Sequence, residues 1–279
     1  MTFQRIYRQK NLFYGGLIVL TVTLMAIFAP MIAPFDPVND ADLMRSELPP
    51  SAEYLFGTDT NGRDAFSRVI YGARVSLSVG LITQIVNTLI GVSLGLVAGY
   101  FGRFWDDLIM GITNVMLSIP VIVFALAIMA ALGPGLFNIY LALGLTNWAY
   151  TCRLTRAQVL SVKKNDYVNA AVVLGYSNAS ILFGQIMPNV LGPVLVIATL
   201  GCAEAILLEA ALSFLGLGTQ PPTPSWGGML SSARDMFFSA PWLSIFPGLA
   251  IFITVLGLNL FGDGLRDILD PKNVLKNKE

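Results

Sequence analysis

Histidine is absent from the 279-residue sequence, and cysteine occurs only twice. Without histidine, the chain cannot form a His-ligated metal site, a His-based catalytic triad or a histidine proton relay. Cys152 and Cys202 both lie in apolar stretches, a setting typical of packed thiols rather than of a disulfide or a metal ligand. We therefore expect this chain to bind neither a metal nor a cofactor of its own.

Charged residues are also scarce, at 12% of the chain against about 25% in an ordinary soluble domain. Hydrophobic residues make up 55%, and the mean hydropathy is +0.68. Such a chain cannot cover its core with a water-compatible surface, which excludes disorder and most soluble enzymes and favours the bilayer. The net charge is +0, so no overall field attracts nucleic acid. No Gly-Lys pair occurs, which excludes a Walker A loop and ATP hydrolysis by this chain.

Long runs without charge are what the sequence does contain. A helix that spans the bilayer needs about 20 apolar residues, and the longest run, residues 108–152, is broken by Gly133-Pro134-Gly135. The first run exceeds the apolar part of a cleaved signal peptide, about 7–15 residues. We predict an all-α integral membrane protein with six transmembrane helices, the fourth of them short. The predicted spans are residues 12–33, 75–101, 108–132, 136–152, 177–203 and 236–262.

The distribution of lysine and arginine predicts how these spans are oriented. If the N-terminus is cytoplasmic, the segments on that side hold 12 of the 17 Lys and Arg residues, and the outer segments hold 5. Cytoplasmic segments of membrane proteins carry the excess of positive charge. We therefore place both termini in the cytoplasm. Residues 35–74, which include seven acids, then form an external segment.

Glycine and proline indicate where the spans pack and bend. Gly91, Gly95 and Gly99 form a stripe on the second span, which lets another helix approach closely. Four prolines lie within or beside spans and should bend or break their helices. They are Pro120, Pro188, Pro193 and Pro247.

Two carboxylates follow the fifth charge-free run. Glu204 and Glu209 are five residues apart, which is about 140° around a helix, so they do not share a face. Either they line a cavity near the outer end of the span, or they form hydrogen bonds to neighbouring helices at the interface. The residues alone leave both interpretations open.

The sequence also predicts a short helix in the cytoplasmic loop of residues 153–176. Asp166 is placed to cap its start, and Gly175 can end it with a left-handed turn. This helix would either dock into a groove of a partner protein or lie on the lipid headgroups. Its narrow apolar face is formed by Val168, Ala171, Val172 and Gly175.

This loop resembles the EAA loop of ABC-importer permeases. The match consists of Asn169-Ala170-Ala171, then Gly175, then Ile186-Met187-Pro188. The sequence departs from the family pattern because Asn169 replaces the usual Glu and Met187 stands where Leu is common. The resemblance implies a coupling helix that docks onto an ATPase subunit. The coupling residues it implies are Asp166, Tyr167, Asn169, Ala170, Ala171 and Gly175.

Three further blocks resemble the dipeptide/oligopeptide/nickel permeases of that group, and in particular their second, C-type subunit. The blocks fall within residues 55–77, 212–227 and 259–271. The first contains Leu55-Phe56-Gly57-Thr58-Asp59 and Gly62-Arg63-Asp64. Either this part contacts a solute-binding protein or it forms a satisfied external turn, and both remain open. The residues concerned are Gly57, Asp59, Gly62, Arg63 and Asp64.

The resemblance implies a type I ABC-importer permease fold and a division of the chain into four parts. These are a cytoplasmic tail with the first helix, an external segment, a core of five helices with coupling loop 153–186, and a cytoplasmic tail. The first candidates for the translocation pathway are Glu204 and Glu209. The next candidates are Gln84 and Asn87 of the second span. The four parts are residues 1–34, 35–74, 75–265 and 266–279.

The implied function is that of a permease subunit, not an enzyme, in a bacterial or archaeal cytoplasmic membrane. It would work with a homologous second permease, two ABC ATPases that bind ATP and Mg²⁺, and an extracytoplasmic solute-binding protein. The implied substrates are di- or oligopeptides, with glutathione, nickel or metal chelates as alternatives within the family. A stand-alone secondary transporter or channel, or a membrane scaffold, are the competing interpretations.

Overall fold

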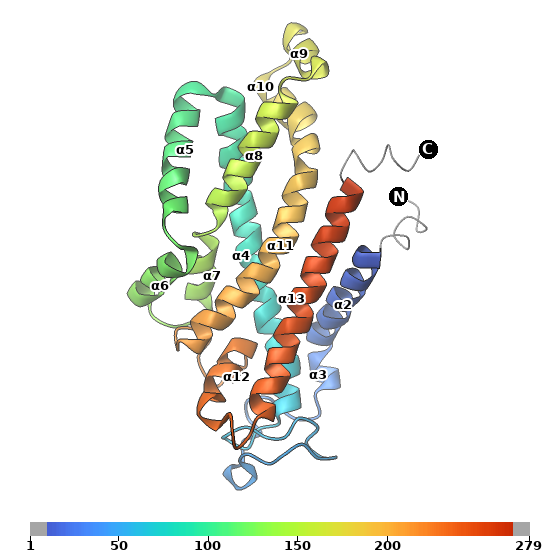
Figure 1. Ribbon diagram of the computed structural model, residues 1–279, viewed down its shortest axis with the longest axis vertical. Helices are drawn as coiled ribbons and strands as arrows, with labels where there is room; N and C mark the ends of the chain where they lie inside the picture. The colour runs from blue at the N-terminus through green and yellow to red at the C-terminus, as the bar shows by residue number, and fades with distance from the viewer. Residues whose placement is uncertain (1–9, 270–279) are drawn as a thin grey trace.

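The computed structural model describes residues 10–269 (Figure 1). Within that range the secondary structure is helical, and extended pairing is confined to one isolated bridge between Thr58 and Asp64. The all-α prediction is confirmed. The longer helices are α2 (Lys10–Ile27), α4 (Ala65–Phe101), α5 (Arg103–Ser118), α6 (Val121–Leu132), α7 (Leu136–Gly144), α8 (Trp148–Val162), α9 (Asp166–Val173), α11 (Met187–Phe214) and α13 (Trp242–Leu269). The shorter ones are α3 (Ala29–Ile32), η1 (Leu43–Arg45), α10 (Asn178–Ile181), the π-helical turn η2 (Leu182–Ile186), α12 (Trp226–Ser232) and η3 (Arg234–Met236).

Helices α2, α4, α5, α8, α11 and α13 run along the long axis of the molecule (Figure 1). Helix α13 runs towards the side of the bundle that carries α9, and α2 starts beside the last part of α13, where a Cβ at Gly264 would meet the Leu12 backbone at 2.4 Å (Figure 1). The loop between α3 and α4 lies at the opposite end, together with α12. Helix α9 and the loop between α3 and α4 therefore lie at opposite ends of the molecule, and the orientation of the termini in the membrane stays a prediction.

Length and apolar composition qualify four segments as membrane spans on their own: α2, α4, α13 and the continuous segment Asn178–Phe214. Helices α5 and α6 qualify only together, and they are bent by 88° at their junction. The bend lies at Ile119-Pro120, where the backbone leaves the helical conformation and Pro120 precedes α6. The predicted span over residues 108–132 is therefore two helices, and the prediction that Pro120 bends or breaks its helix is confirmed.

The predicted fourth span, residues 136–152, is also not a single helix. Helix α7 ends at Gly144, and α8 begins at Trp148 and continues to Val162, ten residues beyond the predicted end. The charge-free criterion failed here because α8 carries Arg153 and Arg156. Arg156 pairs with Asp106 of α5, with 2.6 Å between Nη2 and Oδ2, so the helix continues past its first charges.

The glycine stripe of α4 is where α8 packs. A Cβ added at any of Gly91, Gly95 or Gly99 would lie within 2.7 Å of a side-chain atom of α8. Any residue larger than glycine at these positions would therefore force the two helices apart. The predicted close approach of a second helix is confirmed. The facing residues are Thr151, Thr155 and Val159, in that order.

Candidate coupling and pathway sites

Helix α9 ends in a left-handed turn at Gly175, where φ is +79°. The Gly175 N–H donates to the Val172 carbonyl at 3.0 Å, and the Tyr176 N–H donates to the Ala171 carbonyl at 3.1 Å. This pair of bonds is the Schellman motif that closes a helix C-terminus. The predicted glycine turn is therefore present, and it directs the chain back towards the bundle.

The start of α9 differs from the prediction. Asp166 is the first helical residue, and Asn165 occupies the capping position without a side-chain cap hydrogen bond. The sequence predicted that Asp166 caps the helix through its side chain, and this prediction was wrong. Its negative charge instead lies in the first turn, where it interacts favourably with the helix dipole.

The apolar face predicted for docking is divided, since Val168 and Ala171 are buried against the chain itself whereas Val172 and Gly175 are exposed. Val168 is 1% exposed and Ala171 is 6% exposed, and both belong to a buried cluster with Val159 of α8 and Val190 of α11. Val173, near the end of α9, is by contrast 86% exposed. We call the exposed apolar residues the coupling tip: Tyr167, Val172, Val173, Leu174 and Tyr176.

The predicted coupling residues are divided by this packing. Asp166, Tyr167, Asn169, Ala170 and Gly175 are exposed, whereas Ala171 is buried. The exposed residues are accessible to a partner protein, and Ala171 instead holds α9 against the bundle. Their contact with an ATPase stays a prediction.

Three residues that sequence reasoning missed hold the coupling loop in place. The Tyr100 hydroxyl, at the end of α4, donates to Asn178 Oδ1 at 2.9 Å. Lys163 Nζ donates to the Tyr100 carbonyl at 2.6 Å and lies 5.3 Å from the centre of the Tyr100 ring. The segments before and after α9 are therefore both attached to the end of α4. No sequence motif marks Tyr100, because its partners lie 63 and 78 residues away.

Glu209 is fully buried inside the chain, with 0% exposure. The Ser213 hydroxyl donates to its Oε1 at 2.7 Å, and Ser76 of α4 and Ser225 before α12 lie beside the carboxyl group. Its Oε2 has no hydrogen-bond partner among the described residues. Glu209 thus lies where α4, α11 and α12 meet, which fits the hydrogen-bonding interpretation. Its role in a pathway stays a prediction.

Glu204 has the opposite environment on the same helix. Its side chain is exposed, and no hydrogen bond or ion pair involves it within residues 10–269. The five-residue spacing indeed places the two carboxylates on different faces of α11. Of the two, only Glu204 is accessible from outside the chain.

Gln84 and Asn87 are buried in contacts between helices. Gln84 packs on the backbone of α11, since a Cβ at Gly201 would lie 2.2 Å from Gln84 Oε1. Asn87 donates from Nδ2 to the Leu143 carbonyl of α7 at 3.3 Å. These two side chains therefore join α4 to its neighbours, and their pathway role stays a prediction.

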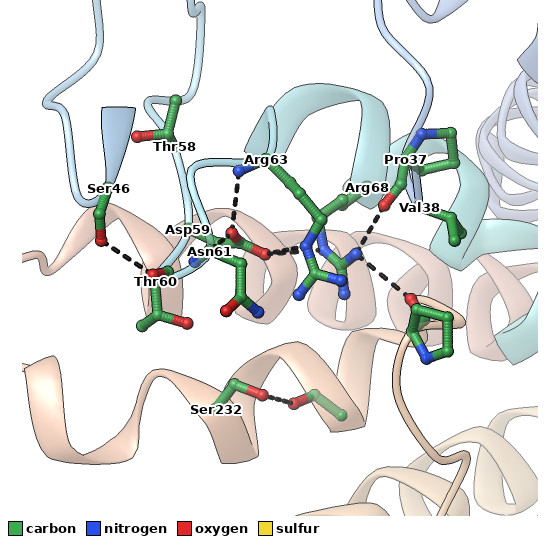
Figure 2. A network of polar contacts seen from close by, with 12 residues as sticks. Pro37, Val38, Ser46, Thr58, Asp59, Thr60, Asn61, Arg63, Arg68 and Ser232 are labelled. Atoms are coloured by element: carbon green, nitrogen blue, oxygen red, sulfur yellow. Dashed lines mark hydrogen bonds and ion pairs between the residues drawn. The ribbon is translucent and has the colours of Figure 1, made fainter. Parts of the chain in front are cut away.

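At the other end of the molecule, Asp59 organises the external block (Figure 2). Its carboxylate accepts backbone N–H bonds from Asn61 and Arg63 at 2.8 and 3.0 Å. It also pairs with the Nε atoms of Arg63 at 2.9 Å and Arg68 at 3.2 Å. Both arginines are more than nine-tenths buried, so they share the single negative charge of Asp59 in a place that is largely shielded from water.

Arg68 extends this network to two other segments. Its Nη1 donates to the carbonyl of Pro37 at 2.7 Å and to that of Pro222 at 3.3 Å (Figure 2). The start of the external segment and the loop before α12 are thereby joined to α4. Arg68 lies in the matched sequence block but was not singled out there, because its partners are 31 and 154 residues away.

Asp64 caps α4 within the same block. Its Oδ2 accepts hydrogen bonds from the backbone N–H and the hydroxyl of Ser67, at 2.8 and 2.6 Å. Gly57 and Gly62 both have φ above +70°. The block is therefore a folded unit with many internal hydrogen bonds, although Asp64 Oδ1 is buried without a hydrogen-bond partner among the described residues. Its contact with a binding protein stays a prediction. Helix α4 accordingly begins at Ala65, well before the charge-free run that started at residue 75.

No group of three or more His, Cys, Asp and Glu side chains that could hold a metal ion occurs in the part of the chain that the structure describes. The geometry thus consists of a buried ion network at one end, an exposed apolar tip at the other, and one accessible carboxylate between them.

Residues 91–274 match the family model described as the binding-protein-dependent transport system inner membrane component. Residues 1–50 match the N-terminal transmembrane domain of oligopeptide transport permease C. The chain belongs to this permease family. It is of the C type found in peptide ABC importers, and its family members are multi-pass inner-membrane proteins of bacteria that leave ATP hydrolysis to separate subunits.

Three curated relatives are similar over nearly the whole chain. The dipeptide transport system permease protein DppC of Alkalihalophilus pseudofirmus is 45% identical over 97% of this chain and 88% of its own length. The di/tripeptide permease DppC of Pseudomonas aeruginosa is 44% identical over 99% of this chain and 92% of its own length. The glutathione permease GsiD of Pectobacterium atrosepticum is 40% identical over 97% of this chain and 90% of its own length.

A solved structure of the MetNI methionine ABC transporter, in inward-facing conformations, contains a chain of similar fold. The TM-score is 0.57 at 16% identity, and the match covers 73% of this chain and 96% of the other. At this identity the similarity concerns the fold alone. The predicted type I ABC-importer permease fold is thereby confirmed.

Proposed function

We propose that this chain is the C-type permease subunit of an importer driven by ATP, and that the importer takes up di- or oligopeptides. The relatives named for dipeptide and di/tripeptide transport, at 45% and 44% identity, support this substrate class. The relative named for glutathione transport supports glutathione, itself a small peptide, as the second candidate.

The partners in this proposal are a homologous second permease, two ABC ATPases and a solute-binding protein. ATP and Mg²⁺ bind to the ATPases rather than to this chain. The α9 end of the bundle faces the cytoplasm, because the positively charged residues gather on that side. The substrate passes between the two permeases, and the binding protein delivers it at the end that carries the Asp59 network.

The coupling tip is the observation that carries the proposal. A soluble loop that exposes five large apolar side chains loses free energy unless another protein covers them. The buried half of α9 and the hydrogen bond of the Tyr100 hydroxyl hold this tip at a fixed position at the end of the bundle. When ATP binding closes the ATPases, a tip docked on them moves with them and transfers that movement to α8 and α11.

The test replaces one tip residue in the complete complex. Leu174→Asp places a charge on an exposed side chain, so the fold is unaffected but the apolar contact with the ATPase is lost. We expect the ATPases to be absent when the tagged chain is purified in mild detergent, and ATP-driven uptake to fall to background.

Phe238→Asp is the matched control. It introduces the same charge at a side chain that is 96% exposed, in the connection from α12 to α13, which lies at the opposite end of the bundle from α9 (Figure 1). We expect the ATPases to co-purify with this variant as with the wild type. Full retention of the ATPases by Leu174→Asp would contradict the coupling role of the tip.

A further inference from the structure

Glu204 lies about half-way along the bundle. Positions 201–206 of α11 pack beside positions 80–84 of α4, since a Cβ at Gly80 would lie 3.1 Å from the Cys202 carbonyl oxygen and from the Ile206 side chain. At 1.5 Å per residue, this level is about 26 Å from the start of α4 and about 28 Å from its end. The hydrocarbon core of a bilayer is about 30 Å thick, so Glu204 lies within its depth.

The surroundings of Glu204 on the surface of α11 are apolar. One turn away on its side of the helix lie Leu200, Leu207 and Leu208, which are exposed or half-exposed. Among residues 10–269, no lysine or arginine pairs with the carboxylate. Glu204 is thus an accessible and unpaired ionisable group in the middle of an apolar surface.

Lipid cannot be the neighbour of such a group at low cost. A carboxylate at the centre of the bilayer is expensive and is found facing the interior of a bundle or a water-filled cavity. The face of α11 that carries Glu204 therefore borders either the second permease or the passage between the two permeases. A carboxylate that borders the passage offers a counter-charge to a cation that enters it.

We propose that Glu204 binds the ammonium group of the substrate as it crosses the membrane. This inference rests on the proposed function, because it takes the substrate to be a peptide with a free amino terminus. A peptide of this kind carries a positive charge that loses its hydration in a narrow apolar passage. A carboxylate half-way along the passage replaces part of that hydration by an ion pair with hydrogen bonds. Selection for amines would then arise in the permease in addition to any selection by the binding protein.

The experiment compares two substrates in liposomes that contain the complete complex and its binding protein. One is alanyl-alanine, and the other is lactoyl-alanine, in which a hydroxyl replaces the amino group. Selection by the binding protein affects the wild type and Glu204→Gln equally, so it cancels when the two proteins are compared on each substrate. We expect Glu204→Gln to lower uptake of alanyl-alanine about tenfold or more, and to leave uptake of lactoyl-alanine unchanged, as loss of one charged hydrogen bond implies.

The control variant is Leu207→Gln, which adds a neutral polar group one turn away and should change uptake of neither substrate. ATP hydrolysis stimulated by the binding protein should be the same in all three proteins. If lactoyl-alanine is not taken up by the wild type, the uptake of alanyl-alanine per ATP hydrolysed decides alone. An unchanged ratio in Glu204→Gln would then overturn the proposal.

Two other outcomes would also overturn it. An equal decrease for both substrates means that Glu204 does not recognise the amino group. Loss of the second permease during purification of Glu204→Gln means that the carboxylate forms an ion pair between subunits. A different result would contradict the proposed function itself: the wild-type complex would then show no ATP-driven uptake of any peptide.

Discussion

The two ends of this permease use their side chains in opposite ways. At the external end, Asp59 holds two buried arginines, and the network closes on itself. At the α9 end, the apolar side chains of the coupling tip are exposed. Charged residues are thus buried at one end, and apolar residues are exposed at the other.

This contrast shows that residue type alone does not identify a contact surface. The charged external block has the composition of a recognition site, but the Asp59 carboxylate and the two arginines bind groups of the chain itself. The apolar coupling tip has the composition of a core, but nothing in the described chain covers it. Apolar exposure alone does not separate the two ends either, because Met44 in the loop between α3 and α4 is 92% exposed. Three pairs of substitutions can test this comparison, and they are ordered by their expected effect on the free energy of unfolding.

The largest effect is expected for Asp59→Ala, which leaves Arg63 and Arg68 buried without their counter-charge. Removing one partner of a buried ion pair costs about 3–5 kcal/mol. We expect a large decrease in the midpoint of thermal unfolding in detergent. Asp42→Ala is the control, because its pair with Arg45 is about half exposed and contributes at most about 1 kcal/mol. Equal midpoints for the two variants would show that the external network is not the stabilising unit described here.

Gly62→Ala and Gly175→Ala compare the two ends at the same backbone conformation, with φ of +72° and +79°. A Cβ at Gly62 would lie 1.8 Å from the Asp42 carbonyl oxygen, whereas a Cβ at Gly175 meets nothing within 4 Å. Left-handed strain alone costs about 1–2 kcal/mol, and overpacking adds about 1–3 kcal/mol at Gly62. We expect Gly62→Ala to lower the unfolding midpoint about twice as much as Gly175→Ala. Similar midpoints would mean that the external segment is loosely packed.

The smallest effect concerns the two faces of α9. Val168→Ala removes buried methyl groups and should cost about 1–2 kcal/mol, whereas Val173→Ala should lie within about 0.5 kcal/mol of the wild type. We expect the opposite order when the ATPases retained by the purified chain are measured, because only Val173 belongs to the coupling tip. The same order in both measurements would remove the distinction between a buried and a docking face.

Much of the fold could be predicted from the sequence, because long apolar runs have few physical solutions in a bilayer. The glycine stripe predicted a close helix contact, and Gly175 predicted a left-handed turn. The failures came where a charge lies on a helix with a partner distant in sequence. Arg156 pairs with Asp106, 50 residues earlier, so α8 continues where the charge-free criterion ended it.

The candidate sites were harder to predict, because the sequence does not say which face of a helix is covered. Val168 and Val172 are the same residue type and lie one turn apart, yet Val168 is buried and Val172 is 56% exposed. Glu204 and Glu209 differ in the same way. In both cases the deciding information is how α9 and α11 are rotated against α4 and α8, which depends on contacts from the whole bundle.

The packing of α8 on the glycine stripe has a mechanical consequence. Three successive turns of α4 lie against α8 without room for a Cβ, so the two helices cannot slide past each other without steric overlap. Helix α9 follows α8 after three residues, and α4 is about 55 Å long. A push on α9 is therefore carried by α4 and α8 as one lever arm. Its far end is the Asp64 cap and the Asp59 network, so a displacement of α9 reaches the segment before α4 through a single stiff body.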